Sequence, residues 1–236
     1  MTIEIDNLHY AWKRRSDFQL NIAELKIAHG EKVFLYGPSG SGKSTLLSLL
    51  GGVLLPQQGR IRILGKELTS LSSVARDRFR ADHVGFLFQQ FNLLPYLSVI
   101  DNILLPCRFS KLRCQRALQT ETSLEKSAIR LLSQLQLDTG LIHQKVTELS
   151  VGQQQRVAAA RAMIGQPELI IADEPTSALD SDRQVAFLDL LLAQCAASNA
   201  SLLMVSHDRR LATRFSQTLA MHDLCAGVNP TMPFSS

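Results

Sequence analysis

The segment GPSGSGKST at residues 37–45 constrains the fold more than any other part of the sequence, because it fits G-x-x-x-x-G-K-[ST] at every required position. A largely apolar run, KVFLY, precedes it at residues 32–36, and residues 44–50 follow it with helical character. A buried strand, a glycine-rich loop and a helix in this order let main-chain N–H groups close round phosphate oxygens at the positive end of the helix. The sequence therefore predicts an α/β fold with a nucleotide phosphate site between this strand and this helix.

Each part of the loop is predicted to have a separate task at the nucleotide. Lys43 is expected to bridge the β- and γ-phosphates of ATP, Ser44 to ligate Mg²⁺, and Thr45 to reach the α-phosphate. A glycine-rich turn without a ligand would fit the same letters, but the apolar strand before it favours the phosphate loop. The residues predicted to contact the nucleotide here are Gly37, Pro38, Ser39, Gly40, Ser41, Gly42, Lys43, Ser44 and Thr45.

A second motif, LIIADEPT at residues 169–176, places two adjacent carboxylates at the end of another apolar strand. Burial would not tolerate this pair without a partner of opposite charge, and a metal–nucleotide complex is such a partner. Asp173 is predicted to hold Mg²⁺, through water, and Glu174 to polarise the attacking water as general base. Alone, the pair could equally cap a helix; together with the upstream loop it favours catalysis.

Hydrophobic periodicity predicts how the rest of the chain is organised. Alternation in the first thirty residues indicates half-buried strands of an edge sheet, with a turn at residues 29–31. Apolar residues recur at helical spacing between Phe91 and Gly152, which predicts a helical insertion. Strands return at residues 169–172 and 202–205 around a helical stretch, so we expect a largely parallel, buried sheet.

These elements are expected to form one domain over residues 1–236. Its predicted parts are a nucleotide-binding core at 1–90 and 160–225, a helical subdomain at 91–159, and a flexible tail at 226–236.

Composition excludes several classes of function. The 25 basic and 21 acidic residues are spread along the chain without a basic stripe, and the run Lys13–Arg15 is predicted to be a solvated loop, so no nucleic-acid partner is expected. The four cysteines match no metal-ligand spacing, and the start MTIEIDN lacks a secretion signal, which indicates a reducing cytoplasm. The most apolar stretch, at 46–56, is too short to span a bilayer, so a membrane connection would run through a partner.

Three further motifs accompany the phosphate loop and the carboxylates: LSVGQQQR at 149–156, SALD at 177–180 and SHD at 206–208. In this order and spacing, the chain from about residue 3 to residue 225 resembles an ABC-type ATPase cassette. The resemblance implies a P-loop (RecA-like) core with an N-terminal antiparallel β-subdomain and an inserted α-helical subdomain. It also implies ATP hydrolysis coupled to transport.

The resemblance assigns roles to single residues of the nucleotide site. Gln89 matches the glutamine that senses nucleotide, adds to the metal site and faces the membrane partner. His207 matches the switch histidine that contacts the γ-phosphate. Trp12 falls where the family places an aromatic side chain on adenine, with Tyr10 as the alternative; either ring could instead belong to the core.

Cassettes of this family work as head-to-tail dimers, which the resemblance implies for this chain as a homodimer or as a pair with a second ABC ATPase. The residues implied to contact the partner's nucleotide or to join the two sites are Ser150, Gly152, Gln153 and Asp180. Val151 stands where the first of two glycines is expected. A positive φ there would cost valine about 1–3 kcal/mol, whereas a negative φ costs only space. Because the other motif residues are present, we predict an active enzyme.

Residues 80–106 resemble the branch that contains the macrolide-efflux (MacB), lipoprotein-release (LolD) and cell-division (FtsE) ATPases. This implies an FtsX/MacB-like integral-membrane permease, with room for a periplasmic adaptor, and a peripheral location on the cytoplasmic side of the bacterial inner membrane. The apolar residues after Gln89 could receive the permease's coupling helix or simply begin the helical core: Phe91, Leu93, Leu94, Pro95 and Tyr96. A soluble or regulatory ABC ATPase that is not coupled to transport, or an ATPase subunit of an importer, stays the alternative.

Overall fold

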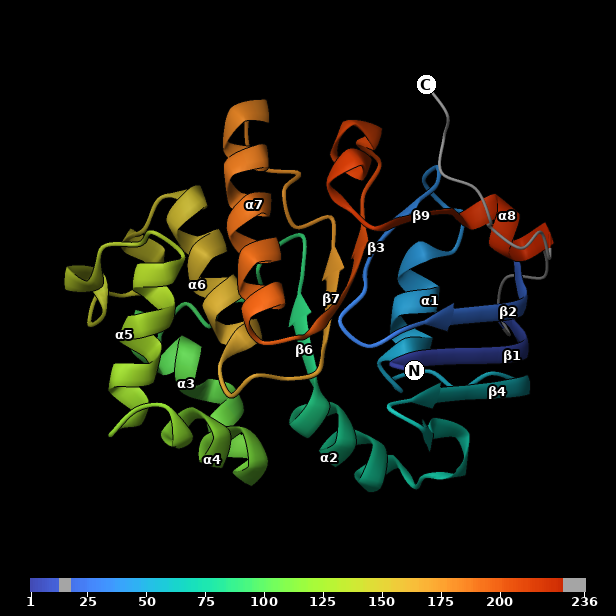
Figure 1. Ribbon diagram of the computed structural model, residues 1–236, viewed down its shortest axis with the longest axis horizontal. Helices are drawn as coiled ribbons and strands as arrows, with labels where there is room; N and C mark the ends of the chain where they lie inside the picture. Colours follow the sequence, from blue (N-terminus) through green and yellow to red (C-terminus); the bar gives the residue numbers. More distant parts are fainter. Residues whose placement is uncertain (13–17, 227–236) are drawn as a thin grey trace.

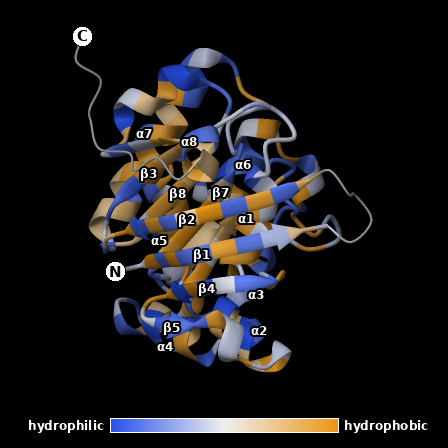
Figure 2. Cartoon of the chain, turned by 90° about the vertical axis from the view of Figure 1, so that its right-hand side faces the viewer, coloured by the Kyte–Doolittle hydropathy of each residue, from blue (hydrophilic) through white to orange (hydrophobic). Residues whose placement is uncertain are grey.

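The structure is a computed structural model that describes residues 1–12 and 18–226. One of its two sheets is antiparallel, in the order β2-β1-β4-β5. Its strands are β1 (Ile3–Ala11), β2 (Gln19–Ile27), β4 (Gln58–Ile63) and the short β5 (Lys66–Glu67). Figure 2 shows hydrophobic and hydrophilic residues alternating along β1 and β2. The inward residues of these strands are buried and the outward ones are not, as a sheet with one covered face requires.

The second sheet has five parallel strands in the order β6-β7-β8-β3-β9. They are β6 (Val84–Leu87), β7 (Leu169–Asp173), β8 (Ser201–Val205), β3 (Lys32–Tyr36) and β9 (Gln217–Ala220). Both faces are covered, because Val33 and Leu35 belong to one core cluster whereas Phe34 belongs to the other. The near-continuous apolar letters of these strands follow from this double burial.

Helices fill the two sides of the parallel sheet (Figure 1). Helix α1 (Lys43–Leu50) lies between it and the antiparallel sheet, with leucines in the same core cluster as Ile3 and Ile5. On the other side, α6 (Val151–Met163) and α7 (Ser181–Ala197) pack on the sheet. Helices α3 (Val99–Phe109), α4 (Lys111–Gln119) and α5 (Leu124–Gln134) pack against α6 and one another. The remaining helices are α2 (Ser73–His83), α8 (Met221–Ala226) and four 3₁₀ segments at Leu68–Ser70, Thr139–Leu141, Val146–Glu148 and Arg209–Arg214.

The predicted fold class is confirmed: an antiparallel sheet, a parallel sheet with the phosphate loop after β3, and a helical insertion are all present. The predicted boundary between residues 159 and 160 falls within α6, and the division into subdomains stays a prediction. The run Lys13–Arg15 and residues 227–236 of the predicted tail lie outside the described residues. Within the described part of the chain, no helix is both long and apolar enough to cross a membrane.

Candidate nucleotide site

A hollow of about 500 Å³ lies beyond the carboxyl ends of the parallel strands. Strands β3, β6, β7 and β8 all run the same way, so the segments that follow them meet at one edge of the sheet. The structure therefore gathers residues that are far apart in the sequence. The lining residues are Trp12, Phe18, Ser39, Gly40, Gly42, Lys43, Ser44, Thr45, Gln89, Asp173, Glu174 and His207.

The phosphate loop has the conformation of an anion cradle. Gly40 and Gly42 have φ of 79° and 99°, a region that favours glycine, and a Cβ at Gly40 would meet no atom within 4 Å. Gly42 precedes the first turn of α1, so the free N–H groups of the helix start face the loop. The Lys43 ammonium lies over the loop and donates to the carbonyls of Gly37 and Pro38 at 2.7 and 2.9 Å. The Ser41 hydroxyl is buried without a hydrogen-bond partner among the described atoms. This arrangement of donors fits a polyphosphate.

The metal-binding candidates lie beside this cradle. The Ser44 hydroxyl donates to Asp173 Oδ2 at 3.2 Å, and Gln89 lines the same hollow. Burial raises the pKa of Asp173, and the nearby Glu174 adds to this rise against the Ser44 hydrogen bond. A hydroxyl, one carboxylate and one amide are few but suitable oxygen donors for Mg²⁺, which binds through one or two protein groups together with phosphate and water. The donor set therefore fits a magnesium–nucleotide complex.

Glu174 is held in an unusual main-chain conformation next to the histidine. Its φ is 45°, and its N–H donates to the Val205 carbonyl at 2.9 Å, which fastens the residue to the end of β8. One carboxylate oxygen, Oε2, lies 2.9 Å from His207 Nδ1. A non-glycine residue in the left-handed region is characteristic of functional sites, where the surrounding structure holds it in place. Both residues of this pair line the hollow.

Two aromatic side chains, Trp12 and Phe18, also line the hollow. The Trp12 side chain is 42% exposed, and its indole N–H donates to the Thr45 hydroxyl at 3.3 Å. Tyr10 is buried and meets Trp12 edge-to-face, with ring centroids 5.5 Å apart, but it does not line the hollow. Phe18 also lines it, and its ring lies 2.8 Å from where a Cβ on Gly42 would be. The alternation of letters around Phe18 predicted a half-buried strand of an edge sheet and gave no sign of this contact.

Residues of the LSVGQQQR motif at 149–156, called the signature from here on, lie elsewhere, at a second hollow of about 750 Å³. Ser150 caps α6 and forms a reciprocal capping box with Gln153, at 3.4 Å for Gln153 N to Ser150 Oγ and 2.8 Å for Ser150 N to Gln153 Oε1. Gly152 and Asp180 line this hollow too, but none of these four lines the first hollow. One chain therefore carries both groups of predicted nucleotide contacts, at two separate places.

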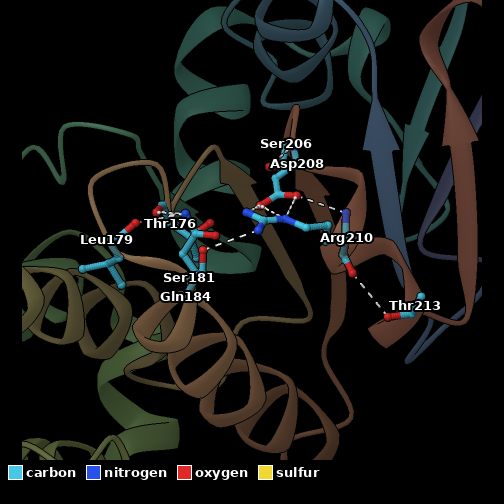
Figure 3. A network of polar contacts seen from close by, with 8 residues as sticks. All are labelled: Thr176, Leu179, Ser181, Gln184, Ser206, Asp208, Arg210 and Thr213. Carbon is cyan, nitrogen blue, oxygen red and sulfur yellow. Dashed lines mark hydrogen bonds and ion pairs between the residues drawn. The ribbon is translucent and has the colours of Figure 1, made fainter.

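The segment after Glu174 and the segment after His207 are tied together by polar contacts (Figure 3). Asp180 caps α7, and the Gln184 side chain donates to the carbonyls of Thr176 and Leu179 at 3.2 and 3.1 Å. Arg210 donates to the Asp208 carboxylate at 2.7 to 3.2 Å and reaches the Ser181 hydroxyl at 3.4 Å. The start of α7 and the loop that carries His207 are therefore held in a common arrangement.

The residues predicted to receive a membrane partner differ in how far they are buried. Phe91 is buried in the larger core cluster, so for this residue the core interpretation is correct. Leu93 and Leu94 are half-buried, while Pro95 and Tyr96 are exposed. A neighbouring groove of about 640 Å³, which sequence reasoning missed, is lined by apolar side chains that include Val74, Phe88, Leu105, Pro106 and Phe109. These residues come from α2, from the segment after β6 and from α3, so no single stretch of sequence signals the groove.

Comparisons with known proteins agree with this geometry. The profile of the family described as "ABC transporter" matches residues 20–177. The protein YbbA of Escherichia coli (strain K12), an ABC transporter ATP-binding protein, is 40% identical over 200 residues, which cover 84% of this chain and 83% of YbbA. The lipoprotein-releasing system ATP-binding protein LolD of Legionella pneumophila (strain Paris) is 36% identical over 200 residues, 85% of each chain.

A solved structure supports the same conclusion. The dimeric ATP-binding cassette MJ0796, in a post-hydrolysis state bound to ADP and Pi, superposes with a TM-score of 0.76 at 32% identity, covering 92% of this chain and 93% of that one. The chain thus belongs to the ABC transporter family, as an ATP-hydrolysing cassette of the branch that contains LolD, MacB and FtsE.

Proposed function

We propose that this cassette powers a membrane permease of the FtsX/MacB type by closing as a head-to-tail homodimer around two ATP molecules. The observation that carries the proposal is the separation of the two hollows within one chain. Each hollow lacks the groups that the other supplies, so a second copy would complete both at once. The dimeric assembly of the relative MJ0796 supports this arrangement.

In this proposal the first hollow performs the chemistry. Lys43 and the N–H groups at the start of α1 bind the phosphates, while Trp12 stacks on the adenine. Glu174 accepts a proton from the attacking water as the water oxygen bonds to the γ-phosphorus and the bond to the bridging oxygen of ADP breaks. His207, 2.9 Å from Glu174, orients the carboxylate and contacts the γ-phosphate. Mg²⁺ held by Ser44, Asp173 and Gln89 would neutralise charge on the β- and γ-phosphate oxygens.

The second hollow serves the other subunit's nucleotide. Ser150 offers its hydroxyl, Gly152 its main-chain N–H group and Gln153 its side-chain amide N–H groups, at the positive end of α6. Asp180 lies beside them at the start of α7 and would help to join the two sites. Closure of the dimer is then the step that ATP binding drives, and hydrolysis resets it.

The groove beside Gln89 is the proposed docking place of the permease. Phe88 directly precedes Gln89 and lines the groove with Phe109, whose side chain is 74% exposed. Apolar side chains at this exposure, framed by the charged Asp77 and Arg78, suit an amphipathic helix on a protein partner. A permease held here would place the cassette peripherally on the cytoplasmic face of the bacterial inner membrane.

The proposal is tested by ATP hydrolysis with and without the integral-membrane protein that co-purifies with the chain from its native host. We expect the membrane protein to raise turnover, and Phe109→Ser to reduce that stimulation. Leu118→Ser is the control. Like Phe109, Leu118 is a large apolar residue exposed to solvent, but it lies outside the groove. Equal stimulation of Phe109→Ser and the wild type would reject the groove, and no stimulation of any form would favour a cassette uncoupled from transport.

A further inference from the structure

Arg161, near the end of α6, has an unusual set of partners. The residue is only 9% exposed. Its guanidinium donates from Nη1 to the Asn92 carbonyl at 2.7 Å and from Nη2 to the Phe91 carbonyl. No carboxylate pairs with it among the residues that the structure describes. Burial lowers the pKa of the guanidinium, which is the cost of placing it here. The planar guanidinium donates to two neighbouring carbonyls, so it fixes the conformation of this main-chain segment and does not neutralise a charge.

The segment that Arg161 holds is one that the main chain would not adopt readily by itself. Phe91 and Asn92 have φ of 58° and 51°, so two successive non-glycine residues are left-handed. The turn is tight, with Phe91 N donating to the Phe88 carbonyl at 3.0 Å. Gln89 lies within this turn and lines the nucleotide hollow. The position of Gln89 therefore depends on whatever keeps Phe91 and Asn92 in place.

The other end of the same helix carries the signature. Arg161 follows Ser150 by eleven positions in one continuous helix, about 16 Å along its axis. The C-terminal end of this helix is itself fixed by Arg113 of α4, which is 2% exposed and donates to the carbonyls of Ile164 and Ala162, both at 2.7 Å. Helix α6 is thus a rod with Ser150 at one end and the Gln89 turn fastened to the other.

The proposed permease groove meets this junction. Asn92, Arg113 and Arg161 all line it, together with Phe88 and Phe109. A partner seated in the groove would therefore touch the point where the turn and the helix are joined.

We propose that Arg161 is a positioning residue that makes Gln89 at the chain's own nucleotide and Ser150 at the partner copy's nucleotide move as one unit. The inference rests on the proposed function, since it needs a nucleotide at each place. Arg161 acts through the turn and the helix and touches no nucleotide itself. Without the two hydrogen bonds of the Arg161 guanidinium, the chain would still fold, but Gln89 and Ser150 would no longer move into position together.

The test compares Arg161→Lys with the wild type for ATP affinity and for kcat. Lysine keeps the charge, but its single ammonium cannot reproduce the two-pronged contact. Affinity is followed by the fluorescence of Trp12, the only tryptophan of the chain, which lines the nucleotide hollow. We expect ATP binding to stay within about twofold and kcat to fall by about tenfold or more, as a misplaced catalytic arrangement predicts.

Arg130→Lys is the matched control, because it makes the same change elsewhere in the helical region. Arg130 is a half-buried arginine of α5 that donates to Gln134 and Thr120, pairs with Glu121 at 3.2 Å, and has no hydrogen bond to the Gln89 turn. Its kcat per bound ATP should equal that of the wild type. An Arg161→Lys enzyme with unchanged kcat, or an equal loss in Arg130→Lys, would overturn the proposal. Absence of hydrolysis in the wild type would instead reject the proposed function.

A surface change tests the same junction without touching the buried arginine. Asn92 is exposed, so Asn92→Ala leaves the core intact while disfavouring the left-handed φ. It should lower kcat at unchanged ATP affinity, and Asn92→Gly, which tolerates that φ, should lose less. Equal kcat in the alanine and glycine variants would contradict the role of the turn, even if Arg161→Lys failed to fold.

Discussion

Val151 is the residue at which this chain departs from the motif of its family, and its surroundings explain why the departure is tolerated. It is the first residue of α6, it is absent from the residues with positive φ, and its side chain is 49% exposed. The β-branched side chain therefore meets neither of the two penalties that the sequence left open, conformational strain or lack of space. The capping box of Ser150 and Gln153 forms round it unchanged.

Val151→Gly should keep ATP hydrolysis at the wild-type level or raise it. The anion contacts at the start of α6 come from the Ser150 hydroxyl and from N–H groups, and glycine adds no donor to them. Glycine in a helix lowers stability by up to about 1 kcal/mol, so a slightly lower melting temperature is expected. Steady-state turnover and thermal unfolding check both parts, with Val151→Ala as the intermediate control; a large loss of turnover on restoring glycine would contradict this account.

Most residues of the site could be predicted because motif residues follow parallel strands, whose ends meet at one edge. Lys43, Asp173, Glu174 and His207 line one hollow for this reason. Phe18 could not be predicted, since its place beside Gly42 depends on a tertiary contact between the start of β2 and the phosphate loop. The main-chain conformation at Val151 could not be predicted either, because the identity of a residue does not determine its φ.

Glu168 connects three elements of the fold, the strand β7 and the helices α2 and α4. It precedes β7, and its carboxylate lies 3.1 Å from His83 Nδ1 at the end of α2 and accepts from Arg116 Nη2 of α4 at 2.6 Å. Burial alone would raise the pKa of Glu168, but the hydrogen bonds from His83 and Arg116 outweigh it and lower the pKa to about 2. This carboxylate connects the parallel sheet to the helical insertion.

Glu168→Gln should lower the free energy of unfolding at neutral pH. A carboxylate whose pKa is lower in the folded state than the ordinary 4.5 stabilises the fold above that value, and the contribution disappears as pH falls towards about 2. The difference between wild type and variant should therefore be full at about pH 7 and shrink below about pH 4.5. Urea unfolding across this range measures it, and a difference that grew on acidification would have the wrong sign.

Elements with a continuous apolar run or a helical apolar pattern could be predicted from the sequence, and elements with few apolar residues could not. The apolar strands β3, β7 and β8 and the helix α7 lie where the sequence placed them. Helix α2 has no buried residue, so it has no apolar stripe to reveal it. Strand β9 is four residues long with one buried position, and it is held by pairing to β3 rather than by its own pattern.

For the whole molecule, the arrangement of two incomplete hollows on one chain implies that its working unit is larger than one copy. Glu174, the proposed general base, lines the first hollow, whereas Ser150 and Asp180 line the second. ATP would join a first hollow to the second hollow of another copy, so nucleotide binding and assembly are expected to be linked. A variant that lacks the proposed general base, Glu174, should then assemble with ATP but not hydrolyse it.

The most direct measurement is steady-state ATP hydrolysis by the purified chain beside its Glu174→Gln variant, with the molecular mass of each followed with and without ATP. Glutamine keeps the shape of the side chain but cannot accept the proton, so turnover should fall by at least about 100-fold while ATP binding persists. The variant should therefore accumulate as an ATP-dependent dimer, and the wild type should form it only transiently. Turnover of Glu174→Gln near the wild-type rate, or a variant that binds ATP and stays monomeric, would contradict the account.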